Sequence, residues 1–276
     1  MNLFKKNTGN NRLLKLYKAV SQSEAETFNT KNLVDFLLLE FDNLKLNLNS
    51  FYITGPYPNG GWKTKKGFLN GLIKKDFKNV HHIMISDSKD LMFLNFQNWS
   101  HNRTIEVDSD SIVIELMFDE QLMTYEELAL LGHRFYDLLN FEYGYVFAQT
   151  KKFSISERKI KNGFFSYSEK ENSEYRKWSK YESATKFGFI RKVYELNFLS
   201  PKHLENDELI RVVKNLGHLE NHEQFSIWKL TKNEVDQALD QLNTSSFLVQ
   251  NKSFDETNTC RLIDMEIKKN THHNIR

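Results

Sequence analysis

The sequence predicts an α+β fold, a mainly antiparallel sheet with helices packed on one face. Three runs between residues 81 and 119 carry this prediction: "HHIMISDS", "LMFLNFQNW" and "RTIEVDSDSIVIELMFD". They are rich in Ile, Val and Phe that partly alternate with polar residues, as strands do. A helix follows, because Thr124 and Glu127 have the spacing of a capping box, and "YGYVFAQT" at 143–150 is a further strand. The order β-β-α-β favours an antiparallel sheet.

The first fifty residues predict one long helix. Apolar residues recur at three- and four-residue spacing within 29–48, and Asn29 or Thr30 can cap the start. The members of this apolar stripe are Leu33, Phe36, Leu37 and Phe41. A short strand, "SFYITG", and a Gly/Pro loop come next. The segment "KGFLNGLIKKDFKNV" then predicts a second helix, which Gly71 weakens.

The second half begins with a polar excursion at 151–187, rich in Lys, Glu and Ser and interleaved with aromatics. We expect it to be partly helical, and to cover the sheet or present an interaction surface. Beyond it the sequence predicts, in order, a strand in "GFIRKVYELNFLS", a helix starting at Ser200–Pro201, a helix around "DELIRVVKNLGHL", the strand "FSIWKL", a helix capped by Thr231 and Glu234, a closing strand "SSFLVQ" and a frayed tail "KKNTHHNIR".

These elements predict two similar lobes, residues 1–150 and 188–276, separated by the excursion at 151–187. A single domain built from both lobes stays open, since 276 residues suit either arrangement.

Composition predicts a cytosolic protein. The net charge is only +2, the apolar fraction of 39% is enough for a substantial core, and no run of about 18 apolar residues could span a membrane. The N-terminal stretch lacks the features of a secretory signal. Cys260 is the one cysteine, so neither an intramolecular disulfide nor a cysteine cluster for zinc can form.

The loop "GPYPNGGWKT" at 55–64 holds two of the three prolines and several glycines, so we tested it as a phosphate-binding loop. Such a loop needs lysine directly after its last glycine, with backbone amides surrounding the phosphates. Here Lys63 and Thr64 come two positions late, and Pro56 and Pro58 remove two amide donors. The spacing therefore indicates a strand-terminating turn with exposed lysines.

Side chains that could hold a metal are scattered. Glu106, Asp108 and Asp110 would share one face of a continuous strand, which is typical of the solvent side of an antiparallel sheet. His218 and His222 could share a helix face, but a site built on that pair needs a third ligand. We therefore predict no metal site, no cofactor and no catalytic residue, while a metal-dependent hydrolase that uses these acids or histidines stays an alternative.

The lysines between Lys63 and Lys78 form a basic cluster with Tyr57 and Trp62 nearby. Positive charge beside aromatic rings can hold single-stranded nucleic acid, and it can equally complement an anionic patch on a protein partner. A solvated helix face and loop is the plain structural interpretation of the same residues.

The segment "GFIRKVYELNFLSPKHL" (188–204) resembles uncharacterised bacterial proteins of the polymorphic-toxin immunity type. The pattern consists of Arg191, Tyr194, Asn197, Leu199, Ser200, His203 and Leu204. A "YGY"-like strand after a helix, matched at 143–145, and a Trp-containing strand, helix and closing segment, comparable with 225–250, extend it over roughly 80–250. The resemblance implies small cytosolic binders that block a partner toxin and are not enzymes.

In physical terms the motif is structural. We expect Asn197 and Ser200 to satisfy backbone groups at a strand-to-helix junction, and His203 to stack or hydrogen-bond there. Tyr194 packs, and Arg191 pairs with a carboxylate of the excursion.

The leading hypothesis is a non-catalytic immunity or inhibitor protein that occludes a partner, most concretely a toxin encoded nearby. The alternative is a nucleic-acid-binding or nuclease-associated phage-defence protein that uses the Lys63–Lys78 cluster. The sequence does not indicate an oligomeric state. Aromatic and basic side chains are common interface anchors. The expected partner contacts are therefore Tyr57, Trp62, Lys63, Lys65 and Lys66 in the loop and Tyr175 and Trp178 in the excursion.

Overall fold

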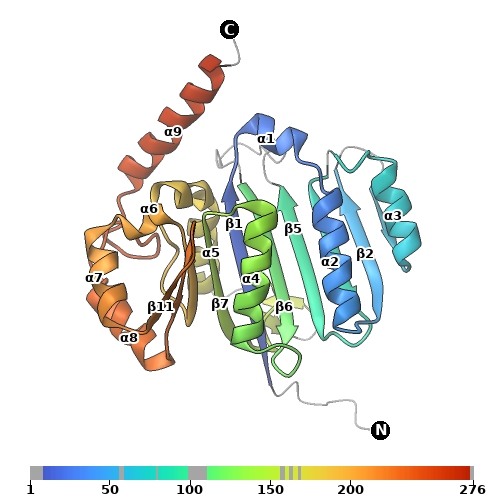
Figure 1. The fold of residues 1–276 in the computed structure, drawn as a ribbon, viewed down its shortest axis with the longest axis horizontal. Helices are drawn as coiled ribbons and strands as arrows, with labels where there is room; N and C mark the ends of the chain where they lie inside the picture. The colour runs from blue at the N-terminus through green and yellow to red at the C-terminus, as the bar shows by residue number, and fades with distance from the viewer. Residues whose placement is uncertain are drawn as a thin grey trace.

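A ten-stranded sheet, antiparallel at every pairing, organises the protein (Figure 1). Its strand order is β11-β12-β10-β7-β1-β6-β5-β4-β2-β3, so the predicted α+β class is confirmed. The structure is a computed structural model that describes residues 9–55, 59–78, 80–98, 111–155, 159–161, 164–166 and 169–273.

The strands of the sheet are β1 (Asn10–Ala19), β2 (Leu48–Thr54), β3 (Gly60–Trp62), β4 (His82–Asp87), β5 (Met92–Asn98), β6 (Ser111–Asp119), β7 (Tyr143–Thr150), β10 (Leu196–Leu199), β11 (His218–Asn221) and β12 (Ser226–Lys229). A separate hairpin pairs β8 (Lys159–Lys161) with β9 (Phe164–Ser166). The helices are α1 (Gln22–Thr27), α2 (Lys31–Asn43), α3 (Lys65–Ile73), α4 (Tyr125–Leu139), α5 (Glu169–Lys180), the 3-10 helix η2 (Glu182–Phe187), α6 (Pro201–Leu204), α7 (Asp207–Asn215), α8 (Lys232–Gln241) and α9 (Glu256–His273).

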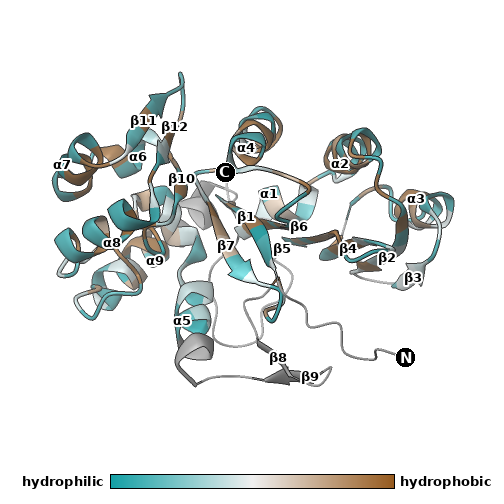
Figure 2. Ribbon diagram, turned by 90° about the horizontal axis from the view of Figure 1, so that it is seen from below, coloured by the Kyte–Doolittle hydropathy of each residue, from teal (hydrophilic) through white to brown (hydrophobic). Residues whose placement is uncertain are grey.

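The central strand β1 shows how the sequence sorts residues between the two faces of the sheet. Side chains alternate along a strand. Leu14 and Leu16 lie in the core beneath the helices, whereas Lys15 and Tyr17 lie on the opposite side. Figure 2 shows α2, α3 and α4 on the first side, the helix face, and α5 on the other, which we call the second face.

Helix starts were the most accurate sequence predictions. The capping boxes of Thr124 with Glu127 and of Thr231 with Glu234 are both formed and begin α4 and α8. Pro201 is the first residue of α6, as expected. At α2 the side chain of Asn29 accepts from the backbone N–H of Lys31, at 2.8 Å, while Thr30 makes no side-chain cap.

Several predicted elements were missed or wrongly assigned, because short strands and short helices can have the same amino-acid composition. Strand β1 was not anticipated within the lysine-rich first twenty residues. Residues 245–250 form a single parallel bridge, Ile190 to Leu248, in place of a closing strand. The tail expected to fray is helical as far as His273. The lobe boundaries at 150 and 188 stay a prediction; in the structure, strands from both ranges share one sheet.

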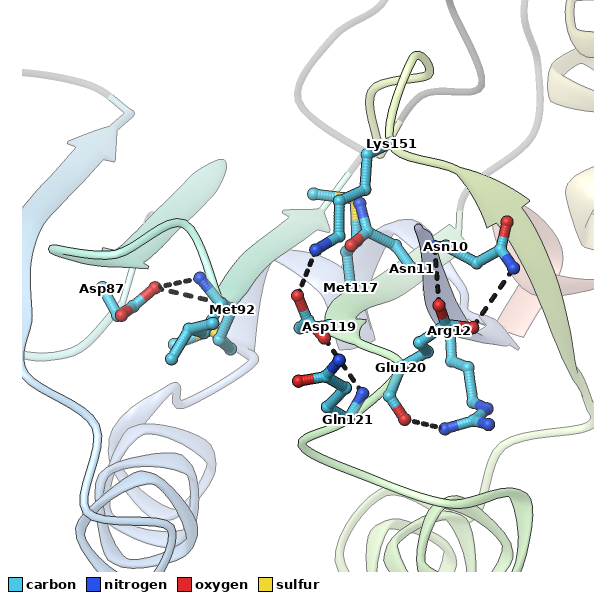
Figure 3. Close-up of polar contacts among 11 residues, drawn as sticks. Asn10, Asn11, Arg12, Asp87, Met92, Met117, Asp119, Glu120, Gln121 and Lys151 are labelled. Atoms are coloured by element: carbon cyan, nitrogen blue, oxygen red, sulfur yellow. Dashed lines mark hydrogen bonds and ion pairs between the residues drawn. The ribbon is translucent and has the colours of Figure 1, made fainter. Parts of the chain in front are cut away.

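Polar contacts fix the turns at one end of the sheet (Figure 3). The carboxylate of Asp87 accepts from the backbone N–H groups of Leu91 and Met92, at 2.6 and 3.0 Å, and so closes the β4–β5 hairpin. Glu120, after β6, accepts from both nitrogens of Asn10, and Lys151 pairs with Asp119. These contacts join the ends of β1, β6 and β7.

Candidate functional site

The part of the second face formed by β2, β4 and β5 carries no Asp, Glu, Lys or Arg side chain. We call this surface the open face. Its residues are Ser50, Tyr52, Thr54, His82, Met84, Ser86, Phe93, Asn95 and Gln97. Charged residues make up 27% of the chain, so nine neighbouring positions on one surface of three adjacent strands without a charged residue are unusual.

Apolar side chains on the open face are accessible. Tyr52 is 39% exposed, while Met84 and Phe93 are partly exposed. The solvent side of an antiparallel sheet is normally polar. The centres of protein interfaces are depleted in charged residues and enriched in Tyr, Met and Phe. The open face therefore has the character of a docking surface.

The open face is continuous with a polar row that crosses the sheet. The strand register places Tyr52 opposite Met84, Met84 opposite Asn95, and Asn95 opposite Glu115. Beyond these, Glu115 lies opposite Lys15, and Lys15 lies opposite Tyr145. The row thus runs from an exposed tyrosine near the sheet edge to buried groups under α5.

The predicted contacts Trp62, Lys63, Lys65 and Lys66 lie together at that edge, on β3, the two-residue link after it and the first turn of α3. The three lysines are exposed, and Lys65 forms an ion pair with Asp42 at 2.7 Å. Lysines at a helix N-terminus oppose the helix dipole, and α3 has no acidic residue in its first turn. Together these residues make one positively charged patch at the β3 edge of the sheet, on its helix side, which we call the basic edge.

Trp62 is half-buried and packs β3 against α3 within the basic edge. Its indole lies over α3, where a Cβ added to Gly67 or to Gly71 would come within 2.7 Å of it. Gly71, which weakens the helix, is thus explained by the close approach of this ring.

A mutation cycle tests this packing. We expect Gly71→Ala to destabilise the protein by about 1 kcal/mol, because overpacking outweighs the gain in helix propensity. In a Trp62→Ala background the same change should stabilise the protein by up to about 1 kcal/mol. Urea unfolding of the four proteins measures both effects. An effect of the same sign in both backgrounds would contradict the explanation.

A buried polar cluster, which sequence reasoning missed, lies where the row passes under α5. The Lys15 ammonium contacts the Glu115 carboxylate at 2.8 Å, and the two side chains are 0% and 2% exposed. Asn95 and Gln97 also donate to Glu115, at 2.7 and 3.1 Å. A lysine and a glutamate at alternating positions of separate strands give no local signal, so only the register reveals the pair.

The cluster continues to Arg191 and Glu182. Arg191 donates to the hydroxyl of Tyr145 at 2.8 Å, and that hydroxyl lies 3.0 Å from the hydroxyl of Tyr17. Glu182 accepts from Ser111 at 3.0 Å. Burial raises the pKa of Glu182 to about 8, and the neighbouring Glu115 acts in the same direction.

The motif at 188–204 is assembled around the same region. The side chain of Asn197 accepts from the backbone N–H of Tyr194 at 3.0 Å and donates to its carbonyl at 2.7 Å. His203 is within 2.8 Å of the Ser200 hydroxyl and stacks on Tyr143. Burial lowers the pKa of His203 to about 4, so this imidazole is neutral at pH 7.

The two aromatics expected in the excursion have different surroundings. Trp178 is fully buried against Tyr17, with ring centroids 5.1 Å apart, so its assignment as a partner contact is corrected to a core position. The sequence around Trp178 is polar, so it did not indicate whether the indole faces the core or the solvent. Tyr175 is partly exposed and lies over the Lys15 ammonium, 5.7 Å from the ring centroid.

Other predicted residues fall elsewhere. Tyr57 and the acidic row of Glu106, Asp108 and Asp110 lie outside the described residues. His218 is on strand β11 and His222 follows it, so the shared helix face was wrong; Gly217, at φ 71°, ends the preceding helical segment. Within the described ranges, no three His, Cys, Asp or Glu side chains are grouped to hold a metal ion.

His222 has a neighbour that the sequence did not indicate. Its ring lies 4.8 Å from that of His133 on α4, and both line a surface hollow of about 410 Å³ with Tyr136 and Phe225. Phe225 stacks on His222 and Tyr136, which explains the contact as aromatic packing.

No helix in the part of the chain that the structure describes combines the length and apolar character that a membrane span requires.

Comparisons with known proteins indicate a fold and not a family. No protein-family model matches the chain. No curated protein matches it either. Among solved structures, the fold is similar to that of the Pseudomonas aeruginosa T6SS protein PA0821, with a TM-score of 0.51 and 11% sequence identity. The match covers 84% of this chain and 73% of that one, and at this identity it shows the fold alone.

Proposed function

We propose that the protein is a non-catalytic, cytosolic binding protein, an immunity or inhibitor protein that occludes a partner toxin with its open face and basic edge. The observation that carries the proposal is the charge-free open face with its exposed Tyr52 and partly exposed Met84 and Phe93. The resemblance of residues 188–204 to immunity-type proteins supports it. The likeness in fold to a T6SS protein is compatible with a toxin-related role.

Charge complementarity specifies the partner. Lys63 and Lys66 are exposed at the β3 edge of the sheet, next to the strand that carries Tyr52, whereas Lys65 is already paired with Asp42. An apolar centre bordered by lysines fits a protein surface with an apolar centre and a carboxylate-rich margin. We therefore expect an acidic protein partner, encoded by the adjacent open reading frame.

Substitutions on the open face test the proposal. The product of the adjacent reading frame should bind the wild-type protein and be neutralised by it in growth assays. Met84→Glu should weaken binding at least 100-fold, because it places a charge at the centre of the interface. Leu39→Glu, which alters an apolar residue 59% exposed on α2, is the matched control and should leave binding unchanged.

Charge reversal separates the basic edge from the open face. The double change Lys63→Glu and Lys66→Glu should mainly slow association, and this effect should shrink as salt is added. Oligonucleotide binding that weakens steeply with salt would instead support the nucleic-acid alternative. Self-association abolished by Met84→Glu would show that a second copy of this chain occupies the face, and it would overturn the proposal.

A further inference from the structure

The segment formed by α5 and η2 covers a charged region of the sheet. It lies on the side of the sheet opposite α2 and α4, across β7 and β1 (Figure 2). Trp178 anchors its first part against Tyr17, and Glu182 at 4% exposure anchors its second part near the Lys15–Glu115 pair. Because this cover buries a carboxyl beside other charged groups, gain or loss of a proton by that carboxyl changes how stably the cover is held. A cover held by apolar contacts alone would not respond to pH in this way.

Glu182 has little to stabilise a negative charge. Among the described residues its one side-chain donor is the Ser111 hydroxyl, at 3.0 Å. The two nearest cations have other partners: Lys15 contacts Glu115 at 2.8 Å, and Arg191 donates to Tyr145 at 2.8 Å. An ionised Glu182 would therefore be buried with a single neutral donor and with the Glu115 carboxylate nearby.

We propose that α5 and η2, residues 169–187, form a strap that is closed over the second face while Glu182 carries a proton and opens when that carboxyl ionises. Opening brings Glu182 to water and uncovers Lys15, whose ammonium lies under the ring of Tyr175. Lys15 lies opposite Glu115 and so belongs to the polar row that begins on the open face. The strap thus controls how far the accessible surface extends toward β7.

The pKa of Glu182 sets the pH range. Burial raises it to about 8 from 4.5, with Glu115 adding to the effect and with Lys15 and Arg191 opposing it. The closed strap therefore binds a proton that the open one releases. Closure is fully stabilised below about pH 4.5, loses stability as the pH rises, and stops losing it above about pH 8.

Other titratable groups lie on the elements that pack against the strap. They are Lys15 and Tyr17 on β1, Glu115 on β6, Lys202 and His203 on α6, Glu256 and Cys260 on α9, Lys186 within η2 and Arg191 after it. Burial lowers the pKa of His203 to about 4, which is below the range, and raises that of Tyr17 well above it. Burial raises the pKa of Glu142 to about 7, and Lys186 of the strap acts on this carboxyl. Because Glu142 titrates in the same pH range as Glu182, it needs its own control.

Hydrogen exchange on the full chain tests the strap. Between pH 5 and pH 8, after correction for intrinsic exchange, the opening constant of residues 169–187 should rise roughly 400-fold in the wild type. Glu182→Gln should abolish this rise, because the amide cannot ionise. The matched control Glu142→Gln should respond as the wild type does. A flat wild-type profile, or an unchanged rise in Glu182→Gln, would overturn the proposal.

A second variant keeps the test decisive where Glu182→Gln does not fold. Ser111→Ala removes the donor that favours the ionised carboxyl, so the opening constant should continue to rise beyond pH 8 before levelling. A plateau at the same pH as the wild type, or at a lower one, would refute the role of Glu182. Toxin binding is not needed for either measurement, so the strap and the proposed function fail separately.

Discussion

Lys15→Met should lower the free energy of unfolding by about 3–5 kcal/mol, one of the largest effects expected from a single side chain here. Lys15 is fully buried, and its ammonium is 2.8 Å from the Glu115 carboxylate. Methionine keeps most of the volume but leaves that carboxylate buried without its cation. Asn95 and Gln97 still donate to it, and neutral amides compensate a buried charge only partly.

Urea unfolding at fixed pH measures the loss, and two further proteins interpret it. Lys31 is 55% exposed and pairs with Asp35 on the surface. Lys31→Met should therefore change the free energy of unfolding by less than about 1 kcal/mol. The double variant Lys15→Met/Glu115→Leu should recover most of the loss, since no unpaired charge remains. A loss in Lys15→Met as small as in Lys31→Met would mean that the pair is solvated in solution.

The sequence predicted those features that depend on local chemistry. The capping boxes that begin α4 and α8 were correct, because the spacing of Thr124 and Glu127 or of Thr231 and Glu234 is sufficient to place a helix start. The strand character of β4, β5 and β7 followed from alternation in the same way.

The features that sequence reasoning missed depend on contacts across the sheet. Lys15 and Glu115 are 100 positions apart, and the pair exists because β1 and β6 are in register. Trp178 is an aromatic among charged residues, so only the packing of α5 on Tyr17 distinguishes it from the exposed Tyr175. The open face likewise appears only when β2, β4 and β5 are aligned, since each strand contributes just three of its residues.

Gly132→Ala should lower the free energy of unfolding by about 1–2 kcal/mol. An added Cβ would lie 2.2 Å from Cζ of Phe198 and 2.5 Å from its Cε1, and both residues are buried. Alanine favours a helix by about 1 kcal/mol over glycine, so only a larger steric cost can produce a net loss. The ring or α4 must move for the methyl group to fit. In Gly132→Ala/Phe198→Leu, where the ring is absent, the effect of the methyl group should be close to zero or favourable.

The same variant tests the division into lobes. Gly132 lies on α4, within the range 1–150, whereas Phe198 lies on β10, within the range 188–276. Because β10 pairs with β7 in one sheet, strain at this contact should affect both ranges together. We expect far-UV circular dichroism and tryptophan fluorescence to report one unfolding transition that shifts as a unit in Gly132→Ala. Two transitions, of which only one shifts, would mean that the lobes unfold independently and that the shared sheet does not couple them.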